Sequence, residues 1–195
     1  MLKNFKFFSK GKRGYIFTAK LNKIRVVIKT NNPKSKAIGR MANEGKWLEI
    51  LNKKGIGPKL LMYTDNFLMY EFIEGVFILD YLKNNRDVKP IILELIRQCR
   101  VMDELKVNKE EMGHPPKHVI VKRDRSVVLV DFERCHRTDK PQNVTQVFQY
   151  LMSKEMEQVL NLKGIALNQN ELIKLLKEYK TDYSKEKYRK LIELI

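Results

Sequence analysis

The first third of the chain alternates short apolar runs with turn residues. Runs rich in β-branched and aromatic side chains predict strands, and they lie at 5–8, 15–19, 24–30, 60–64 and 67–72. Between the third and fourth runs, residues 36–53 carry apolar side chains at three- and four-residue steps, which predicts a helix. Gly55-Ile-Gly57-Pro58 follows, and a glycine with proline shortly after it is typical of a helix end. These elements predict a small β-rich lobe with one helix.

From Gly75 onward the pattern is mostly helical. Apolar spacing predicts helices at 77–83, 88–106, 144–160, 171–179 and 184–194. One β-hairpin is expected within residues 118–131, turning at Arg123-Asp-Arg125. We therefore predict an α+β fold with two lobes, an N-terminal lobe of residues 1–72 and a mostly helical C-terminal lobe of residues 73–195. A cleft between two such lobes is the expected ligand site.

The hairpin carries a candidate site. Its second strand, Val127-Val-Leu-Val, runs directly into Asp131-Phe-Glu133, and its first strand follows His118. A carboxylate that ends a buried strand has left the core, so we expect Asp131 to face a ligand. The hairpin is expected to hold His118 near the same end, with room for a metal ion or phosphate between the two side chains.

The bulk composition places the protein among globular proteins. Its 195 residues are 43% hydrophobic, which is sufficient for one sizeable domain or two small lobes. No apolar run approaches the roughly 20 residues that a membrane span needs, and the first residues do not resemble a signal peptide. Cys99 and Cys135 make no disulfide framework. We therefore expect a cytoplasmic protein with no membrane partner.

The formal net charge of +16 is spread unevenly along the chain. Residues 1–65 hold 16 Lys and Arg against three acids, a balance of +13, and the remaining 130 residues hold 23 against 20, a balance of +3. One interpretation is a surface for RNA or another polyanionic partner, or for a protein partner, on the N-terminal lobe. The other is that these lysines provide solubility and phosphate binding without forming a patch.

Five motifs follow one another along residues 5–135. They are Gly11-Lys-Arg-Gly14-Tyr-Ile16, Val26-Val-Ile-Lys29, Asn43-Glu44, Met69-Tyr-Glu71-Phe-Ile-Glu-Gly75 and Asp131-Phe132-Glu133. Their sequences and their order resemble the protein-kinase-like fold. The similarity is greatest to the small atypical kinases: the RIO type, small archaeal Ser/Thr kinase-like proteins, and the kinase-like ATPases of the archaeal and eukaryotic tRNA-modification complex. This resemblance covers about two thirds of the chain.

The resemblance implies that the chain binds ATP together with Mg²⁺ or Mn²⁺. The loop from Gly11 to Gly14 would cover the phosphates with its backbone N–H groups. Lys29 would pair with the α- and β-phosphates, and Glu44 would hold Lys29 in place by an ion pair. Asp131 would chelate the metal ion, because hard cations prefer carboxylate oxygen.

The resemblance also implies an adenine site and a second metal ligand. The backbone of Glu71, Phe72 and Ile73 would hydrogen-bond the adenine edge, with Gly75 turning the chain into the helical lobe. Alignment of the first hairpin strand places His118 where the family has a metal-binding asparagine. A histidine nitrogen can ligate a metal ion, although Mg²⁺ prefers oxygen.

Three positions depart from the family pattern. Ser9 stands for the first loop glycine, Glu133 replaces the glycine that follows Asp131-Phe132, and Gly113 stands where the catalytic aspartate is expected. His114 could accept a proton in its place, because imidazole suits that role near neutral pH. Glu110 or Glu111 could do so if the loop is shifted, and Lys117 could neutralise charge on the γ-phosphate.

The function expected from these residues is that of an ATP- and Mg²⁺-binding atypical Ser/Thr protein-kinase-like phosphotransferase or ATPase. Only 62 residues follow Glu133, which leaves little room for peptide-docking helices and favours a compact enzyme. The alternative is a pseudokinase that docks RNA or a protein partner through its basic N-terminal lobe. A third interpretation groups the histidines with Asp131 as a transition-metal site, but Pro115 and Pro116 forbid a regular helix between His114 and His118.

Overall fold

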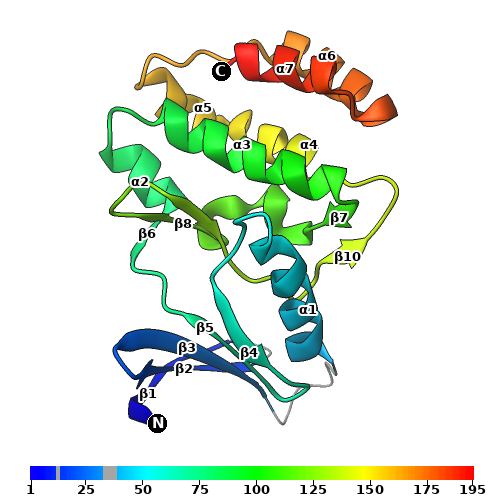
Figure 1. Cartoon of the computed structure of the whole chain (residues 1–195). Helices are drawn as coiled ribbons and strands as arrows, with labels where there is room; N and C mark the ends of the chain where they lie inside the picture. Colours follow the sequence, from blue (N-terminus) through cyan, green and yellow to red (C-terminus); the bar gives the residue numbers. More distant parts are fainter. Residues whose placement is uncertain (12–13, 33–38) are drawn as a thin grey trace. The chain divides into compact units, whose positions relative to one another are not determined.

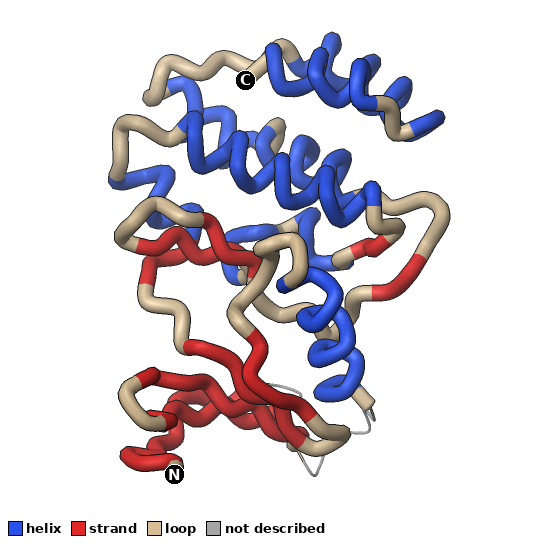
Figure 2. The backbone as a smooth tube through the Cα atoms, viewed as in Figure 1, coloured by secondary structure: helices blue, strands red, loops and turns tan. Residues whose placement is uncertain are grey.

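The computed structural model describes residues 1–11, 14–32 and 39–195 (Figure 1). It confirms the predicted mixed α and β class. The chain divides into two compact units, of which the first contains residues 1–74 and 128–135 and the second contains residues 75–127 and 136–195. Residues 128–135, which we assigned to the C-terminal lobe, group with the first unit. Figure 2 shows that the first unit is mostly strand and the second mostly helix.

The first unit is built on a five-stranded antiparallel sheet of order β1-β2-β3-β5-β4. The strands are β1 (Leu2–Lys10), β2 (Gly14–Leu21), β3 (Ile24–Asn31), β4 (Leu60–Tyr63) and β5 (Phe67–Glu71). All five predicted strands are confirmed. Their register places Lys29 directly opposite Ile16 on β2 and Leu68 on β5. Because successive side chains alternate between the faces of a sheet, Ile28 and Lys29 lie on opposite faces.

One helix, α1 (Arg40–Asn52), belongs to the same unit. It was predicted from residue 36, and residues 36–38 lie outside the described part of the chain. Met41, Leu48 and Leu51 are its buried apolar side chains. The helix ends as predicted, at a turn in which Gly55 and Gly57 have φ angles of 70° and 85°. A Cβ on Gly57 would lie 2.6 Å from Leu48, so this turn requires glycine for space as well as for conformation.

The second unit is organised around its helices. These are α2 (Ile78–Asn84), α3 (Lys89–Glu104), α4 (Asn143–Leu151), α5 (Lys154–Asn161), α6 (Gln169–Asp182) and α7 (Lys185–Glu193). The predicted helix 144–160 is wrong in one respect, because α4 and α5 are separate. The Ser153 side chain accepts from the Met156 N–H and caps α5, which ends the preceding helix. None of the described helices has the length and apolar character needed to cross a membrane.

Short strands complete the second unit. There β6 (Gly75–Phe77) pairs antiparallel with β8 (Val119–Lys122). The next strand, β9 (Val127–Leu129), begins at the last residue of this stretch of the second unit and continues into residues assigned to the first unit. The predicted hairpin strands are β8 and β9. A second pairing joins β7 (Val107–Asn108) to β10 (His136–Arg137). Neither β7 nor β10 was predicted, because a two-residue strand has no detectable periodicity.

A buried carboxylate connects three helices of the second unit. Asp103 of α3 accepts hydrogen bonds from Asn143 Nδ2 at 2.7 Å, at the start of α4, and from the Tyr179 hydroxyl of α6 at 2.9 Å. Burial raises the pKa of Asp103, and these donors oppose that shift. The phenol oxygen of Tyr179 also accepts from Arg100 at 3.0 Å. This network fixes the packing of α3, α4 and α6.

Candidate active site

Lys29 owes its position to the alternation of β3. Val26, Val27 and Ile28 precede it and are buried, so the strand is anchored in the sheet up to the residue before the lysine. The Lys29 side chain is itself only 13% exposed. An ammonium group with so little solvent must be paired with opposite charge to remain ionised. The strand therefore brings a largely buried cation to one face of the sheet.

Two carboxylates meet this ammonium. Lys29 Nζ donates to Glu44 Oε2 at 2.8 Å and to Glu44 Oε1 at 3.0 Å, and it lies 3.3 Å from Asp131 Oδ1. Glu44 comes from α1, and Asp131 follows β9, 102 residues beyond Lys29 in the sequence. Of the predicted site residues, Lys29, Glu44 and Asp131 are thus brought together within one unit.

The electrostatics of the group follow from its burial. Burial lowers the pKa of Lys29, but Glu44 and Asp131 outweigh that effect and hold it well above its ordinary value. Burial likewise raises the pKa of Glu44, and the Lys29 ammonium opposes that shift. Nearby Tyr70, buried in β5, has its pKa raised to about 12, first by burial. Lys29 is therefore a permanent cation near neutral pH, and Asp131, with 33% of its side chain exposed, is the more accessible of its two partners.

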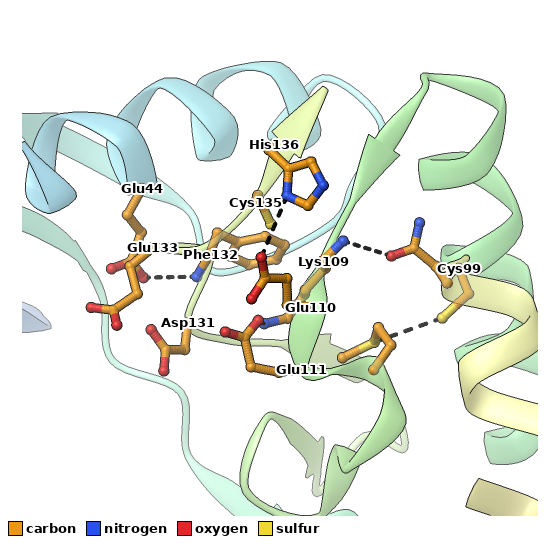
Figure 3. Close-up of polar contacts among 12 residues, drawn as sticks. Glu44, Cys99, Lys109, Glu110, Glu111, Asp131, Phe132, Glu133, Cys135 and His136 are labelled. Atoms are coloured by element: carbon orange, nitrogen blue, oxygen red, sulfur yellow. Dashed lines mark hydrogen bonds and ion pairs between the residues drawn. The ribbon is translucent and has the colours of Figure 1, made fainter. Parts of the chain in front are cut away.

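The segment around Asp131 is tied to α1 by four contacts. Glu44 Oε1 accepts from the Phe132 N–H at 3.3 Å (Figure 3). Asn43 Nδ2 donates to the carbonyls of Glu133 and Cys135 at 3.0 and 3.1 Å, and Arg40 pairs with Glu133 at 3.0 Å. These contacts hold Asp131 in a left-handed conformation with φ of 67°, which aspartate tolerates better than most residues.

Three of these contacts come from Arg40, to which we had assigned no role, and from Asn43, which was named only beside Glu44. Arg40 lies three positions before Asn43, so the two side chains are neighbours on the surface of α1. This spacing of two polar residues was the available signal. Glu133, which stands where the family has glycine, pairs with Arg40.

A pocket of about 390 Å³ opens beside the Lys29 and Asp131 pair. Its lining residues come from the first unit alone: Gly11, Gly14, Tyr15, Ile16, Lys29, Thr30, Met41, Asp131 and Glu133. The Gly11 N–H donates to the Gly14 carbonyl at 2.9 Å, which closes the turn between β1 and β2. A Cβ on Gly14 would collide with the Thr30 carbonyl, so β2 and β3 require glycine there. Residues 12 and 13 of this loop lie outside the described part.

No protein-family model and no curated protein matches this sequence. The functional assignment therefore depends on the side chains and on the family resemblance of their motifs.

The segment predicted to hold adenine follows β5. The Glu71 N–H donates to the Lys59 carbonyl at 3.0 Å, and the Phe72 N–H donates to the Arg25 carbonyl at 2.9 Å. Both donors are thus used within the first unit. The Phe72 ring also carries the Arg25 guanidinium at 3.7 Å from its centroid.

The remaining predicted site residues belong to the second unit. His114 is exposed and lies between two short 3-10 helices, η1 (Glu110–Gly113) and η2 (Pro115–Lys117). Lys117 is exposed at the end of η2, and His118 follows as a half-buried residue. The fully buried Lys109 pairs with Glu111 at 3.0 Å, and Glu110 lies 3.8 Å from His136 (Figure 3). Both glutamates considered above as proton acceptors therefore have positively charged or ionisable neighbours.

The transition-metal interpretation requires several ligands in one place. Across residues 1–11, 14–32 and 39–195, no three His, Cys, Asp or Glu side chains gather closely enough to hold a metal ion. Mg²⁺ bound with a nucleotide needs fewer protein ligands, because phosphate oxygens and water complete its coordination. One carboxylate beside a phosphate-sized pocket, as at Asp131, fits that requirement.

Proposed function

We propose that the protein binds ATP with Mg²⁺ or Mn²⁺ and transfers or hydrolyses the γ-phosphate, as a two-lobed atypical protein-kinase-like phosphotransferase or ATPase. One observation carries the proposal. Lys29, Glu44 and Asp131, the residues that the resemblance assigns to phosphate and metal, form a single charged group although 102 residues separate Lys29 from Asp131. If the motifs resembled the family only by chance, there would be no reason for these three side chains to lie together.

Each residue has a role that its geometry supports. Lys29 offers a permanent positive charge to the α- and β-phosphates, and Glu44 fixes the direction of its ammonium. Asp131 offers a partly exposed carboxylate to the metal ion, which neutralises phosphate charge when bound. Gly11 and Gly14 line the same pocket, and their loop would cover the phosphates. Fixed charges of this kind stabilise phosphoryl transfer without reorganising during the reaction.

The family alignment alone implies three further roles. His114, which is exposed, would take the proton of the attacking hydroxyl or water, Lys117 would neutralise γ-phosphate charge, and His118 would be the second metal ligand. Loss of activity in His114→Ala with unchanged nucleotide affinity is the result expected for a proton acceptor.

The test measures MgATP binding by calorimetry and turnover of γ-labelled ATP, following both released phosphate and label on the protein. We expect Lys29→Ala to lose binding and Asp131→Ala to lose turnover. Lys23→Ala and Asp124→Ala are the matched controls, because Lys23 and Asp124 are exposed turn residues outside the pocket. Turnover retained in Asp131→Ala would overturn its metal role. Binding without turnover in the wild type would instead support the pseudokinase alternative.

A further inference from the structure

One face of the five-stranded sheet carries four cations on its first three strands. Lys3 of β1 lies opposite Lys20 of β2, and Lys20 lies opposite Arg25 of β3, so the three form one row across the strands. Lys6 lies opposite Thr18, two residues before Lys20, which places it on the same face. All four cations are exposed. We call the surface formed by Lys3, Lys6, Lys20 and Arg25 the basic face.

The sheet does not offset the mutual repulsion of these cations. Strands β1, β2 and β3 contain no Asp or Glu, and Glu71 of β5 pairs with Lys59 at 2.9 Å. Within the part of the chain that the structure describes, no ion pair joins the basic face to a carboxylate. Like charges directly opposite one another destabilise a sheet. A polyanionic partner would relieve that repulsion, so the arrangement favours such a partner.

Aromatic rings border the same face. The Arg25 guanidinium lies 3.7 Å from the centroid of the Phe72 ring, and the Phe72 N–H donates to the Arg25 carbonyl at 2.9 Å. The Phe8 ring meets the Phe72 ring edge-on, at a centroid distance of 6.1 Å and an interplanar angle of 83°. Phe8 is nevertheless 56% exposed. The basic face therefore combines exposed cations with an accessible ring.

The other exposed rings of β1 lie on the opposite face of the sheet. Phe7 lies opposite Phe17, which precedes Thr18 along β2, and the Phe5 ring stacks on Phe17 with a centroid distance of 4.9 Å. Successive side chains of a strand alternate between its faces, so these rings point away from the basic face. Phe5 is 57% exposed, and it therefore matches Phe8 in strand and exposure without bordering the row of cations.

We propose that the basic face binds single-stranded RNA. The lysines neutralise the phosphates, and unpaired bases stack on the Phe8 ring and on the guanidinium of Arg25, which Phe72 holds in place. Bases that are free to stack in this way are found in the loops and ends of RNA. An acidic protein segment or an anionic lipid surface would neutralise the cations but would give the Phe8 ring nothing to stack on. Single-stranded RNA uses both features of the basic face.

The inference does not depend on the proposed ATP site. Arg25 precedes Lys29 by four residues on β3, which is about 13 Å at the rise of a strand. Among the described residues, those that line the pocket beside Lys29 include none of Lys3, Lys6 and Lys20. Substitution of these three lysines should therefore leave MgATP affinity unchanged, and Lys29→Ala should leave RNA affinity unchanged. Failure of one proposal is thus distinguishable from failure of the other.

The experiment is a fluorescence-anisotropy titration of the full chain with a labelled oligouridylate of about 12 nucleotides, at several salt concentrations. The first variant replaces the three lysines of the basic face with glutamine. Its matched control removes the same charge from three exposed lysines of the same unit that lie outside the sheet, Lys46, Lys53 and Lys54. Each phosphate contact with a single strand contributes about 0.7 to the slope of log affinity against log salt. We expect the first variant to lose about 2 from that slope and to bind about tenfold more weakly at 100 mM salt, and the control to bind like the wild type.

The second variant, Phe8→Leu, keeps apolar volume and removes the flat ring, and Phe5→Leu is its control. We expect Phe8→Leu to weaken RNA binding about fivefold or more and Phe5→Leu to have no effect. Melting temperatures of all variants establish that they are folded, and MgATP affinity is measured on the same samples.

Four results would overturn the proposal. Equal affinity of the two lysine variants would mean that the basic face is not the binding surface. Equal affinity of the two phenylalanine variants, or of single-stranded and duplex RNA, would mean charge attraction without stacking. Binding that is lost in Lys29→Ala but kept in the basic-face variant would place RNA in the nucleotide pocket. Binding to polyglutamate or to phosphatidylserine vesicles but not to RNA would favour an acidic protein or a lipid surface.

Discussion

The carboxylate of Glu44 lies 2.8 Å from the ammonium of Lys29, and the Glu44 side chain is only 1% exposed. Removing Glu44 leaves the largely buried Lys29 ammonium with Asp131, at 3.3 Å, in place of two carboxylates. We therefore expect Glu44→Ala to lower the free energy of unfolding by about 3 kcal/mol. The double variant Lys29→Met with Glu44→Ala should be less destabilised than the sum of its single substitutions.

Urea denaturation of the four proteins at pH 7 measures this coupling. Glu49→Ala is the control on the same helix, because Glu49 is exposed, and its effect should stay within about 0.5 kcal/mol. Strictly additive effects of the Lys29 and Glu44 substitutions would show that the pair does not act as a unit.

The Asn43 side chain should keep residues 131–135, the segment that carries Asp131, well ordered. Asn43→Ala removes two hydrogen bonds to the carbonyls of Glu133 and Cys135, at a cost of about 1–2 kcal/mol. Amide hydrogen exchange of residues 131–135 should accelerate, and MgATP affinity should fall. Lys46→Ala, an exposed position on the same helix, should change neither quantity. Unchanged exchange in Asn43→Ala would mean that other contacts suffice to hold the segment.

Gly45 should be intolerant of alanine although it lies inside a helix. Helix propensity alone favours alanine over glycine by about 1 kcal/mol. A Cβ on Gly45, however, would collide with the Tyr63 ring and lie 2.7 Å from the Tyr63 Cβ. We expect Gly45→Ala to lower the free energy of unfolding by about 1–3 kcal/mol, and Tyr63→Ala to suppress much of that loss.

Gly113→Ala provides the comparison for that experiment. A Cβ on Gly113 has no other atom within 4 Å, so thermal unfolding of this variant should match the wild type. A stabilising effect of Gly45→Ala would show that α1 and β4 can separate at no cost.

The pH dependence of the unfolding free energy should reveal the protonation state of Lys29. The Glu44 and Asp131 carboxylates overcome the effect of burial and raise the pKa of Lys29 above its ordinary value of 10.5. A raised pKa means that the protonated lysine contributes stability that is fully present below pH 10.5 and is lost as the pH rises through the folded-state value. The difference in unfolding free energy between wild type and Lys29→Met should be constant from about pH 7 to 9.5 and then decline. A decline already complete at pH 9 would indicate a lowered pKa.

Much of the first unit could be predicted from local patterns. The strands containing Tyr15–Ala19 and Ile24–Thr30 are rich in β-branched and aromatic side chains, and the helix around Leu48 repeats apolar side chains at three- and four-residue steps. The split between α4 and α5 was missed, because Val144 to Leu160 keeps a helical period across Ser153. That serine competes for a backbone N–H and starts a new helix, an effect that periodicity does not register.

The candidate site was predictable as a set of residue types and not as a complete structure. Asp131 could be chosen because it ends an apolar strand, and Lys29 and Glu44 because their motifs resemble those of the protein-kinase-like fold. Arg40 and Asn43 were missed, because their role depends on the backbone of residues 133–135, which is distant in sequence.

The sequence by itself determined the elements, the uneven charge and the identity of the three charged residues, because these depend on side-chain type and on neighbours a few positions away. Only the tertiary structure decided that Lys29 meets Asp131, that residues 128–135 belong to the first unit, and that Phe5 and Phe7 share a face with Phe17. These three features depend on strand register and on long-range packing. A shift of one residue in either strand would reverse every side chain between the two faces of the sheet.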